Sequence, residues 1–507
     1  MNLTIKCTAD NWSIPDIAPH EYIHCDGKHL VISGHRTARR NVFVIVAPDA
    51  VTVSDDYQSL CTEIVRLGGL SVNPDSLAHL LRNALCPTPM TALINVYSLA
   101  FGDKLKIRTS SDGAPTVKDH EYANPFLNAL SRGDSEPSTD TLFRLLCEAI
   151  DEHLGSASGS VLMLSSGKDS TSLLLALAEL GRKNVRALTY GAGTANDEEG
   201  YAAMAARRLG VPHTTVRLTD DPDHIKSTLN HYFENTPFPC LDNTQIAYIL
   251  SLAEADVSNE VVLDGTGNDQ YMGYVPSKNL RVKLACNVSR FLPSASIDLL
   301  SHVSVLTYFA KSRSEASFPG YYLSPKTIEQ LLGIHDPTKE YWAESDEKHV
   351  GLDMFDYLAT VKLRHYDSNQ VFLKGRTAAA ARGVAIEFPW TNDKIADYYF
   401  NLPEADRFDR GGFVNKILLR RMLRERLEYP DAAFGKRYFE FQLAPFMAAH
   451  RKFVIDEIFA CNLWQSPVRT FVPRWYDSLS STPRLAYGLN ALFMISGWYN
   501  HSKYIKR

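Results

Sequence analysis

The sequence predicts an α/β protein whose larger part is a doubly wound parallel sheet with a helical C-terminal part, preceded by a smaller β-rich domain. Three observations predict this class. From about residue 141, short apolar runs alternate with amphipathic helical patterns, as in a parallel sheet with crossover helices. Residues 1–125 carry short runs bounded by Asp-Gly, Pro and Ser turn signals. After about residue 350 the pattern is mostly helical.

The elements follow in order along the chain. In the β-rich part, the expected strands include HLVIS (29–33), NVFVIVAP (41–48) and KLKIRTS (104–110). In the second part, helices are expected at 141–154, at 172–180 ending at Gly181, and at 198–210 ending at Gly210. Apolar strands are expected at 160–166, 185–191, 213–218 and 259–265.

Length and composition favour more than one domain, because 507 residues exceed one ordinary core. The stretch SRGDSEPSTD at 131–140 has the composition of a linker. We therefore expect a domain at 1–125, a linker at 126–140 and a second domain at 141–507. Residues 275–350 are less regular, with several Pro and Ser, and are predicted to form an insertion.

Overall composition restricts the class of protein. A hydrophobic content of 45% and a charged content of 22% are ordinary for a soluble globular protein, and a net charge of −5 argues against a general nucleic-acid binder. Eight cysteines without a CxxC pair favour free thiols. No apolar run approaches the roughly 20 residues of a membrane span, and the start lacks a signal-peptide pattern. We expect a cytoplasmic protein with no membrane or nucleic-acid partner.

The stretch LMLSSGKDSTSLLL at 162–175 places a polar loop between a strand and a helix. Free N–H groups at a helix start favour an anion, and Gly167 allows close approach. Lys168 adds positive charge, whereas Asp169 is expected to hold Mg²⁺ shared with phosphate oxygens. Hydroxyl donors are Ser165, Ser166, Ser170 and Thr171. The Walker A pattern is absent, and the alternative is an ordinary turn with Asp169 or Ser170 as helix cap.

A second loop, VVLDGTGNDQYMGY at 261–274, also follows an apolar strand. Its glycines let the backbone run close to a ligand, and Asp269 is a candidate second carboxylate for the same metal. Ligands of open parallel sheets bind beyond the carboxyl ends of the strands, so both loops are expected to face one pocket. The alternative is a tight Gly-Asn turn with Asp269 capping a helix.

These loops, in this order, resemble the synthetase domain of asparagine synthetases, which belongs to the PP-loop ATP pyrophosphatase superfamily. SSGKDS matches its SGGxDS motif and GTGND its GxGxD loop. Further matching segments keep the family's order: EEGYAAMAARRLGVPH (198–213), RGVAIEFPWTNDKIADYYFNLP (382–403), NKILLRRML (415–423) and GKRYFEF (435–441). The resemblance covers about residues 141–450 and implies a PP-loop, adenine nucleotide α-hydrolase-like fold.

The resemblance also implies a reaction. ATP activates a carboxylate as an acyl-adenylate with release of pyrophosphate, and an amine or ammonia then forms the amide and releases AMP. ATP and Mg²⁺ are the implied cofactors, with Asp169 and Asp269 at the metal. Lys436 would stabilise negative charge on the α-phosphate or the tetrahedral intermediate, whereas alone it would indicate only a surface lysine. Residues implied to hold or approach the nucleotide are Ser165, Ser166, Gly167, Lys168, Ser170, Gly265 and Gly267.

The chain departs from the family at its N-terminus. Asn2 stands where the family's glutaminase half carries its nucleophilic cysteine, directly after Met1. Cys7 cannot replace it, because that chemistry uses the terminal amine beside the nucleophile. NVYSLAFGDKLKI at 95–107 still resembles a segment near the end of that half. We therefore interpret residues 1–125 as a shortened, inactive, Ntn-like glutaminase domain, and expect no use of glutamine.

The synthetase loops depart as well. Thr266 stands where asparagine synthetases have Glu and β-lactam synthetases have Tyr, and a threonine hydroxyl is a poor general base. Ala385 replaces a supporting Glu, and Glu387, on the same side of an extended backbone, is the candidate replacement; a surface ion pair is the alternative. Lys168 replaces an apolar residue but is common in other PP-loop branches.

Three features indicate that the substrate itself supplies the attacking amine. They are the loss of the glutaminase, the altered position of the general base and the insertion. The preferred hypothesis is intramolecular macrolactam formation on a precursor peptide, as in lasso-peptide cyclases, with a leader protease or recognition protein as partner. A β-lactam product is disfavoured by Thr266. The alternatives are an ammonia-dependent amidotransferase acting on a small acid or sugar acid, and a non-catalytic nucleotide-binding protein. A tRNA-thiolating enzyme is disfavoured, because paired cysteines and a basic surface are missing.

Overall fold

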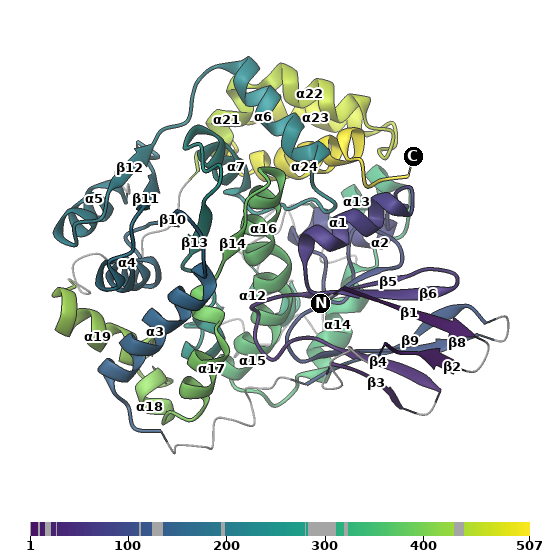
Figure 1. Ribbon diagram of the computed structural model, residues 1–507. Coiled ribbons are helices and arrows are strands. Elements are labelled where there is room, and N and C mark those ends of the chain that lie inside the picture. Colours follow the sequence, from purple (N-terminus) through teal and green to yellow (C-terminus); the bar gives the residue numbers. More distant parts are fainter. Residues whose placement is uncertain are drawn as a thin grey trace.

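A computed structural model describes residues 2–8, 11–15, 22–26, 28–110, 113–123, 135–193, 198–278, 280–281, 311–318, 323–429 and 441–506. Figure 1 shows two parts: a β-rich N-terminal part and a larger α/β part followed by helices. The expected linker falls largely outside the described residues, and helix α3 (Thr139–Leu154) begins the second part.

The N-terminal part contains two antiparallel sheets. One has the order β2-β1-β6-β5-β7 and the other β3-β4-β8-β9. The strands are β1 (Asn2–Thr8), β2 (Asn11–Ser13), β3 (Ile23–Asp26), β4 (His29–Ser33), β5 (Val42–Val46), β6 (Ala50–Ser54), β7 (Val96–Leu99), β8 (Asp103–Thr109) and β9 (Pro115–Tyr122). Alternation along β5 explains the layers: Val44 packs between the sheets, whereas Phe43 and Ile45 pack against the helices α1 (Tyr57–Arg66) and α2 (Pro74–Asn83).

The second part is built on a five-stranded parallel sheet of order β12-β11-β10-β13-β14. Its strands are β10 (Ser160–Met163), β11 (Val185–Tyr190), β12 (His213–Val216), β13 (Val261–Asp264) and β14 (Ile386–Glu387). Helices α3, α4 (Lys168–Leu180) and α5 (Glu199–Arg208) share one core with Leu162, and α6 (Pro222–Glu234) and α7 (Gln245–Glu254) share the other with Val161. Both faces are therefore covered, as the predicted doubly wound sheet requires.

The helical C-terminal part follows the sheet. Its helices are α15 (Met354–Val361), the π-helix η3 (Lys362–Val371), α16 (Phe372–Ala381), the 3₁₀ turn η4 (Pro389–Thr391), α17 (Asp393–Phe400), α18 (Glu404–Arg407), α19 (Ile417–Leu427), α21 (Leu443–Ala449), α22 (Arg451–Ala460), α23 (Val468–Asp477) and α24 (Leu485–His501). A short ribbon, β15 (Phe408–Asp409) with β16 (Val414–Asn415), precedes α19. Within the described part of the chain, none of the helices has the length and apolar character of a membrane crossing.

The predicted insertion is helical where it is described. It contains α12 (Arg313–Ser317), α13 (Pro325–Leu332) and α14 (Thr338–Lys348). A buried ion pair, Arg82 Nε to Glu315 Oε1 at 2.9 Å, joins α2 to α12. Trp342 of α14 donates its indole N–H to Asn83 at 2.9 Å. The insertion therefore packs on the N-terminal helices.

The C-terminal residues also reach the N-terminal part. Leu70 donates its N–H to the Tyr504 carbonyl at 3.0 Å and accepts from the Lys506 N–H at 2.9 Å. These bonds form a parallel bridge between Leu70 and Ile505. Helices α1, α2 and α24 share one hydrophobic core. The two parts are thus joined by backbone hydrogen bonds as well as by packing.

Candidate active site

The two polar loops meet at the carboxyl edge of the parallel sheet, as predicted. The first follows β10 and the second follows the neighbouring strand β13. They line one cavity of about 330 Å³, together with side chains of η3 and α16. Strand order reverses at this point of the sheet, which is where open α/β sheets bind ligands.

The first loop is a preorganised strand-to-helix turn. Gly167 is the N-cap of α4, so the first N–H groups of that helix open toward the cavity. The Ser165 hydroxyl accepts from the Gly167 N–H at 3.0 Å and shares a hydrogen bond of 2.9 Å with the Ser170 hydroxyl. The loop and the first N–H groups of α4 therefore form a site that favours an anion.

Two predicted members of the first loop do not line this cavity. Ser166 is buried and donates its hydroxyl to Glu198 Oε1 at 3.0 Å, while its carbonyl accepts from the Tyr429 hydroxyl at 2.6 Å. The Lys168 ammonium lies over the Tyr429 ring, 5.6 Å from its centroid. The side chains of Ser166 and Lys168 therefore pack against Glu198 and Tyr429 instead of lining the cavity. The cavity is lined by Ser165, Gly167, Asp169 and Ser170.

The second loop rests directly on the first. A Cβ atom at Gly265 would lie 2.8 Å from the Ser170 backbone nitrogen, so only glycine permits this approach. Gly267 has φ of +122°, a conformation that L side chains rarely adopt. Asp264 Oδ1 accepts from the N–H and the hydroxyl of Thr266, at 2.9 and 2.6 Å. The Thr266 hydroxyl is therefore engaged as a donor.

Asp169 and Asp269 converge on one positive charge. The Lys416 ammonium lies 2.5 Å from Asp169 Oδ2 and 3.1 Å from Asp269 Oδ1. Burial alone would lower the pKa of Lys416, but the two carboxylates outweigh it and raise this pKa above its ordinary value. The Asn268 amide donates to the other oxygen of Asp169. Two carboxylates sharing a cation beside an anion cradle are a donor set that fits Mg²⁺ with phosphate oxygens.

Several residues at or beside the cavity carry no local sequence signal. Lys416, just before α19, has a left-handed backbone with φ of 60°. Its sequence indicates a role only through its place in the NKILLRRML segment, which resembles a segment of the family. The cavity is also lined by Lys362, Tyr366 and Asp367 of η3 and by Tyr274 after the second loop.

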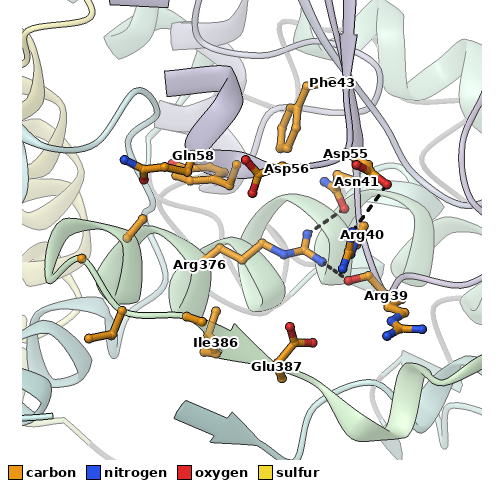
Figure 2. A pocket seen from close by; sticks show the side chains of 15 residues that line it. Arg39, Arg40, Asn41, Phe43, Asp55, Asp56, Gln58, Arg376, Ile386 and Glu387 are labelled. Atoms are coloured by element: carbon orange, nitrogen blue, oxygen red, sulfur yellow. Dashed lines mark hydrogen bonds and ion pairs between the residues drawn. The ribbon is translucent and has the colours of Figure 1, made fainter. Parts of the chain in front are cut away.

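Glu387 lines a different cavity. Its Oε2 lies 2.5 Å from His153 Nδ1. It lines a cavity of about 500 Å³ together with Arg376 and Arg40. Figure 2 shows these side chains together with others of the N-terminal part, such as Asp55. Ala385 and Ile386 line the same cavity. The structure therefore does not bring Glu387 together with Thr266. Lys436 lies outside the described residues.

The family model described as asparagine synthase matches residues 141–458, more than half of the chain. Two curated 7-cyano-7-deazaguanine synthases of Leptospira interrogans, from serovars copenhageni and Lai, are each 30% identical over 128 residues, which is 23% of this chain and 52% of each relative. The chain thus matches about half the length of these relatives.

A solved structure is also similar. It is the NH3-dependent NAD synthetase of Campylobacter jejuni in complex with the nitrate ion, with 16% identity and a TM-score of 0.22. The match covers 48% of this chain and 96% of that one.

Proposed function

The chain belongs to the asparagine synthase family of ATP-dependent carbon–nitrogen ligases, and from this premise we propose that it forms an amide without using glutamine. A carboxylate substrate attacks the α-phosphate of ATP, giving an acyl-adenylate and pyrophosphate. An amine then attacks the acyl carbon, giving the amide and AMP. The family match confirms the family and the class of enzyme predicted from the sequence.

One observation carries the proposal. Asp169 and Asp269, from separate loops, converge within hydrogen-bonding distance of one ammonium beside the N-terminal N–H groups of α4. A protein that only retained the fold would have no need of both carboxylates at this place. Mg²⁺ held by them would neutralise phosphate charge and orient the α-phosphate. Ser165, Gly167, Ser170, Gly265 and Gly267 would then contact the nucleotide.

The chain's own residues supply the remaining chemistry in this proposal. Lys436, in the GKRYFEF segment, stabilises the charge that develops on the α-phosphate or on the tetrahedral intermediate. The position of Thr266, which donates to Asp264, leaves the general base to another residue. Glu387 in its separate cavity is a weaker candidate for this task than the sequence suggested.

The N-terminal part is proposed to be a glutaminase-like, Ntn-like domain that has lost its chemistry. Two stacked antiparallel sheets support this interpretation. We place its boundary at 1–125, with a linker at 126–140 and the synthetase domain at 141–507. A protein of this kind would act in the cytoplasm.

For the substrate, we favour a peptide whose own amino terminus attacks its activated side-chain carboxylate, giving a macrolactam. Support comes from the proposed loss of glutaminase chemistry and from the described part of the insertion, whose helices α12 and α14 contact Arg82 and Asn83 of α2. A precursor peptide with its leader protease or recognition protein would be the partner. The second candidate is an ammonia-dependent amidotransferase acting on a small acid or sugar acid.

The proposed function is tested by measuring the release of pyrophosphate and AMP. The purified chain is incubated with ATP, Mg²⁺ and one of three acids: aspartate, glutamate, or a synthetic peptide with a free amino terminus and internal Asp and Glu side chains. Hydroxylamine is added to trap any acyl-adenylate as a hydroxamate. Pyrophosphate that depends on the peptide, with loss of water from the peptide mass, supports the macrolactam. Pyrophosphate with aspartate or glutamate and ammonia supports the second candidate, and none with any acid contradicts the proposal.

A further inference from the structure

Part of the cavity wall is a π-helix. η3 spans Lys362–Val371, and helices of this type are rare and frequently mark functional sites. Because a π-helix bonds residue i to residue i+5, positions four and five apart share a face. The cavity is lined by Lys362, Tyr366, Asp367 and Val371, which follow that spacing. An α-helix, with neighbours at three and four, would turn Asp367 away from Lys362.

The other face of η3 is anchored to the N-terminal part. Arg364 donates to Asp103 Oδ1 at 3.0 Å, and the Asn369 amide donates to the Cys86 carbonyl at 2.7 Å. The Thr88 N–H donates to His365 Nδ1 at 3.2 Å. These contacts hold the helix in the register that presents Asp367 to the cavity.

Among the described residues, four carboxylates line the cavity. Three of them interact with Lys416, Thr266 or Tyr248. Asp169 and Asp269 pair with Lys416. Asp264 accepts hydrogen bonds from Thr266 and from the Tyr248 hydroxyl. The fourth, Asp367, accepts from the Tyr274 hydroxyl.

Tyr274 and Asp367 both line the cavity. Asp367 is buried, whereas Tyr274 is half-buried. The Lys362 ammonium lies over the Tyr274 ring, 4.3 Å from its centroid, and 5.2 Å from the centroid of Tyr366. The phenol oxygen of Tyr274 can therefore meet a substrate while its proton is held by Asp367.

The charge state suits proton transfer. Burial raises the pKa of Asp367 to about 7, against the opposing influence of Lys362, of the Tyr274 hydrogen bond and of Lys416, while Asp269 raises it further. Burial also raises the pKa of Tyr274 well above its ordinary value, so the phenol keeps its proton. An ideal catalytic base has a pKa near the working pH.

We propose, resting on the amide-forming function above, that Tyr274 and Asp367 form the proton relay that deprotonates the attacking amine. As the amine nitrogen bonds to the acyl carbon, the bond from that carbon to the AMP oxygen breaks, and its electron pair leaves with AMP. The N–H proton passes to the Tyr274 oxygen while the phenol proton passes to Asp367. The balance is one proton moved from nitrogen to the Asp367 carboxylate. Tyr274 is the catalytic residue, and Asp367 acts through it.

The experiment separates the two half-reactions, using the full chain and the acid of the three above that gives most pyrophosphate. Tyr274→Phe and Asp367→Asn are compared with wild type and with Tyr97→Phe in β7, a tyrosine outside the cavity. We expect amide formation to fall about 10²- to 10⁴-fold in both cavity variants. Pyrophosphate release and hydroxamate formation should persist, since hydroxylamine is unprotonated at neutral pH and needs no base.

The dependence of amide formation on pH distinguishes a proton relay through Tyr274 and Asp367 from a purely structural role of these residues. In wild type, amide formation should rise with pH through about 7 as Asp367 ionises, and this rise should be absent from residual Asp367→Asn activity. Thermal unfolding of each variant checks that it is folded. If Asp367→Asn does not fold, Tyr274→Phe still tests the relay, because it removes only one oxygen atom. Full amide formation in the Tyr274 variant overturns the relay alone. No pyrophosphate from the wild type overturns the proposed function, and the relay with it.

Discussion

Adding a single methyl group at Gly265 tests the contact between the two loops. In Gly265→Ala the new Cβ would lie 2.8 Å from the Ser170 nitrogen and 3.1 Å from the Asp169 carbonyl carbon. Both are backbone atoms, so no side chain can rotate away, and the loops must separate by about 0.5 Å to restore ordinary contact. Since Asp169 and Asp269 lie on opposite sides of this contact, the separation changes the distance between their carboxylates.

The expected magnitude follows from that displacement. A misplacement of 1 Å near a reacting centre costs about 100-fold in rate, so we expect adenylation about 10- to 100-fold slower. Overpacking should also lower the free energy of unfolding by about 1–3 kcal/mol. Pyrophosphate release and thermal unfolding measure the two effects.

Gly200→Ala is the matched control. Gly200 lies in α5 with a helical backbone, and no neighbouring atom lies within 4 Å of the position that its new methyl group would take. This change should leave adenylation unchanged and stabilise the helix by up to about 1 kcal/mol. Wild-type adenylation in Gly265→Ala would refute the reasoning, because the loops would then tolerate separation.

Three other predictions concern single side chains. Asp169→Asn and Asp269→Asn should each abolish adenylation, measured as pyrophosphate release across a Mg²⁺ titration, and full activity in either variant would refute the metal assignment. Lys436→Ala should leave ATP binding intact in a fluorescent-nucleotide assay but stop product formation; unchanged turnover contradicts its assigned role. Glu315→Ala should destabilise the fold by about 3–5 kcal/mol, because it leaves the Arg82 charge buried. Chemical denaturation measures this, and the double change Arg82→Met with Glu315→Leu should recover most of the loss.

The predictable part of the site is the part encoded locally. The loops at 165–170 and 265–269 lie between an apolar strand and a helix, and parallel strands bring their carboxyl ends to one edge. The cavity-facing residues Ser165, Asp169 and Asp269 followed from this. Ser166 and Lys168 did not, because which side of a tight turn a residue faces depends on what packs behind it, here Glu198 and Tyr429.

The remaining site residues come together only through the tertiary fold. Lys416 reaches the two carboxylates from the residue before α19, far along the chain, and its left-handed backbone has no signature in NKILLRRML. Tyr274 and Asp367 meet because η3 is held in π-helical register by the N-terminal part. Sequence periodicity alone predicts a helix there, with the wrong residues facing the cavity.

The backbone bridge between Leu70 and Ile505 has a consequence for how the molecule is made. The layer of α1 and α2 is completed by residues that are synthesised only after almost the whole synthetase part. Until then its apolar side lacks α24, and such late, non-local closure is slow and leaves surface open to aggregation. Docking of α24 and of the residues around Ile505 would thus decide when the chain finishes folding, and chaperone dependence in expression is the expected sign.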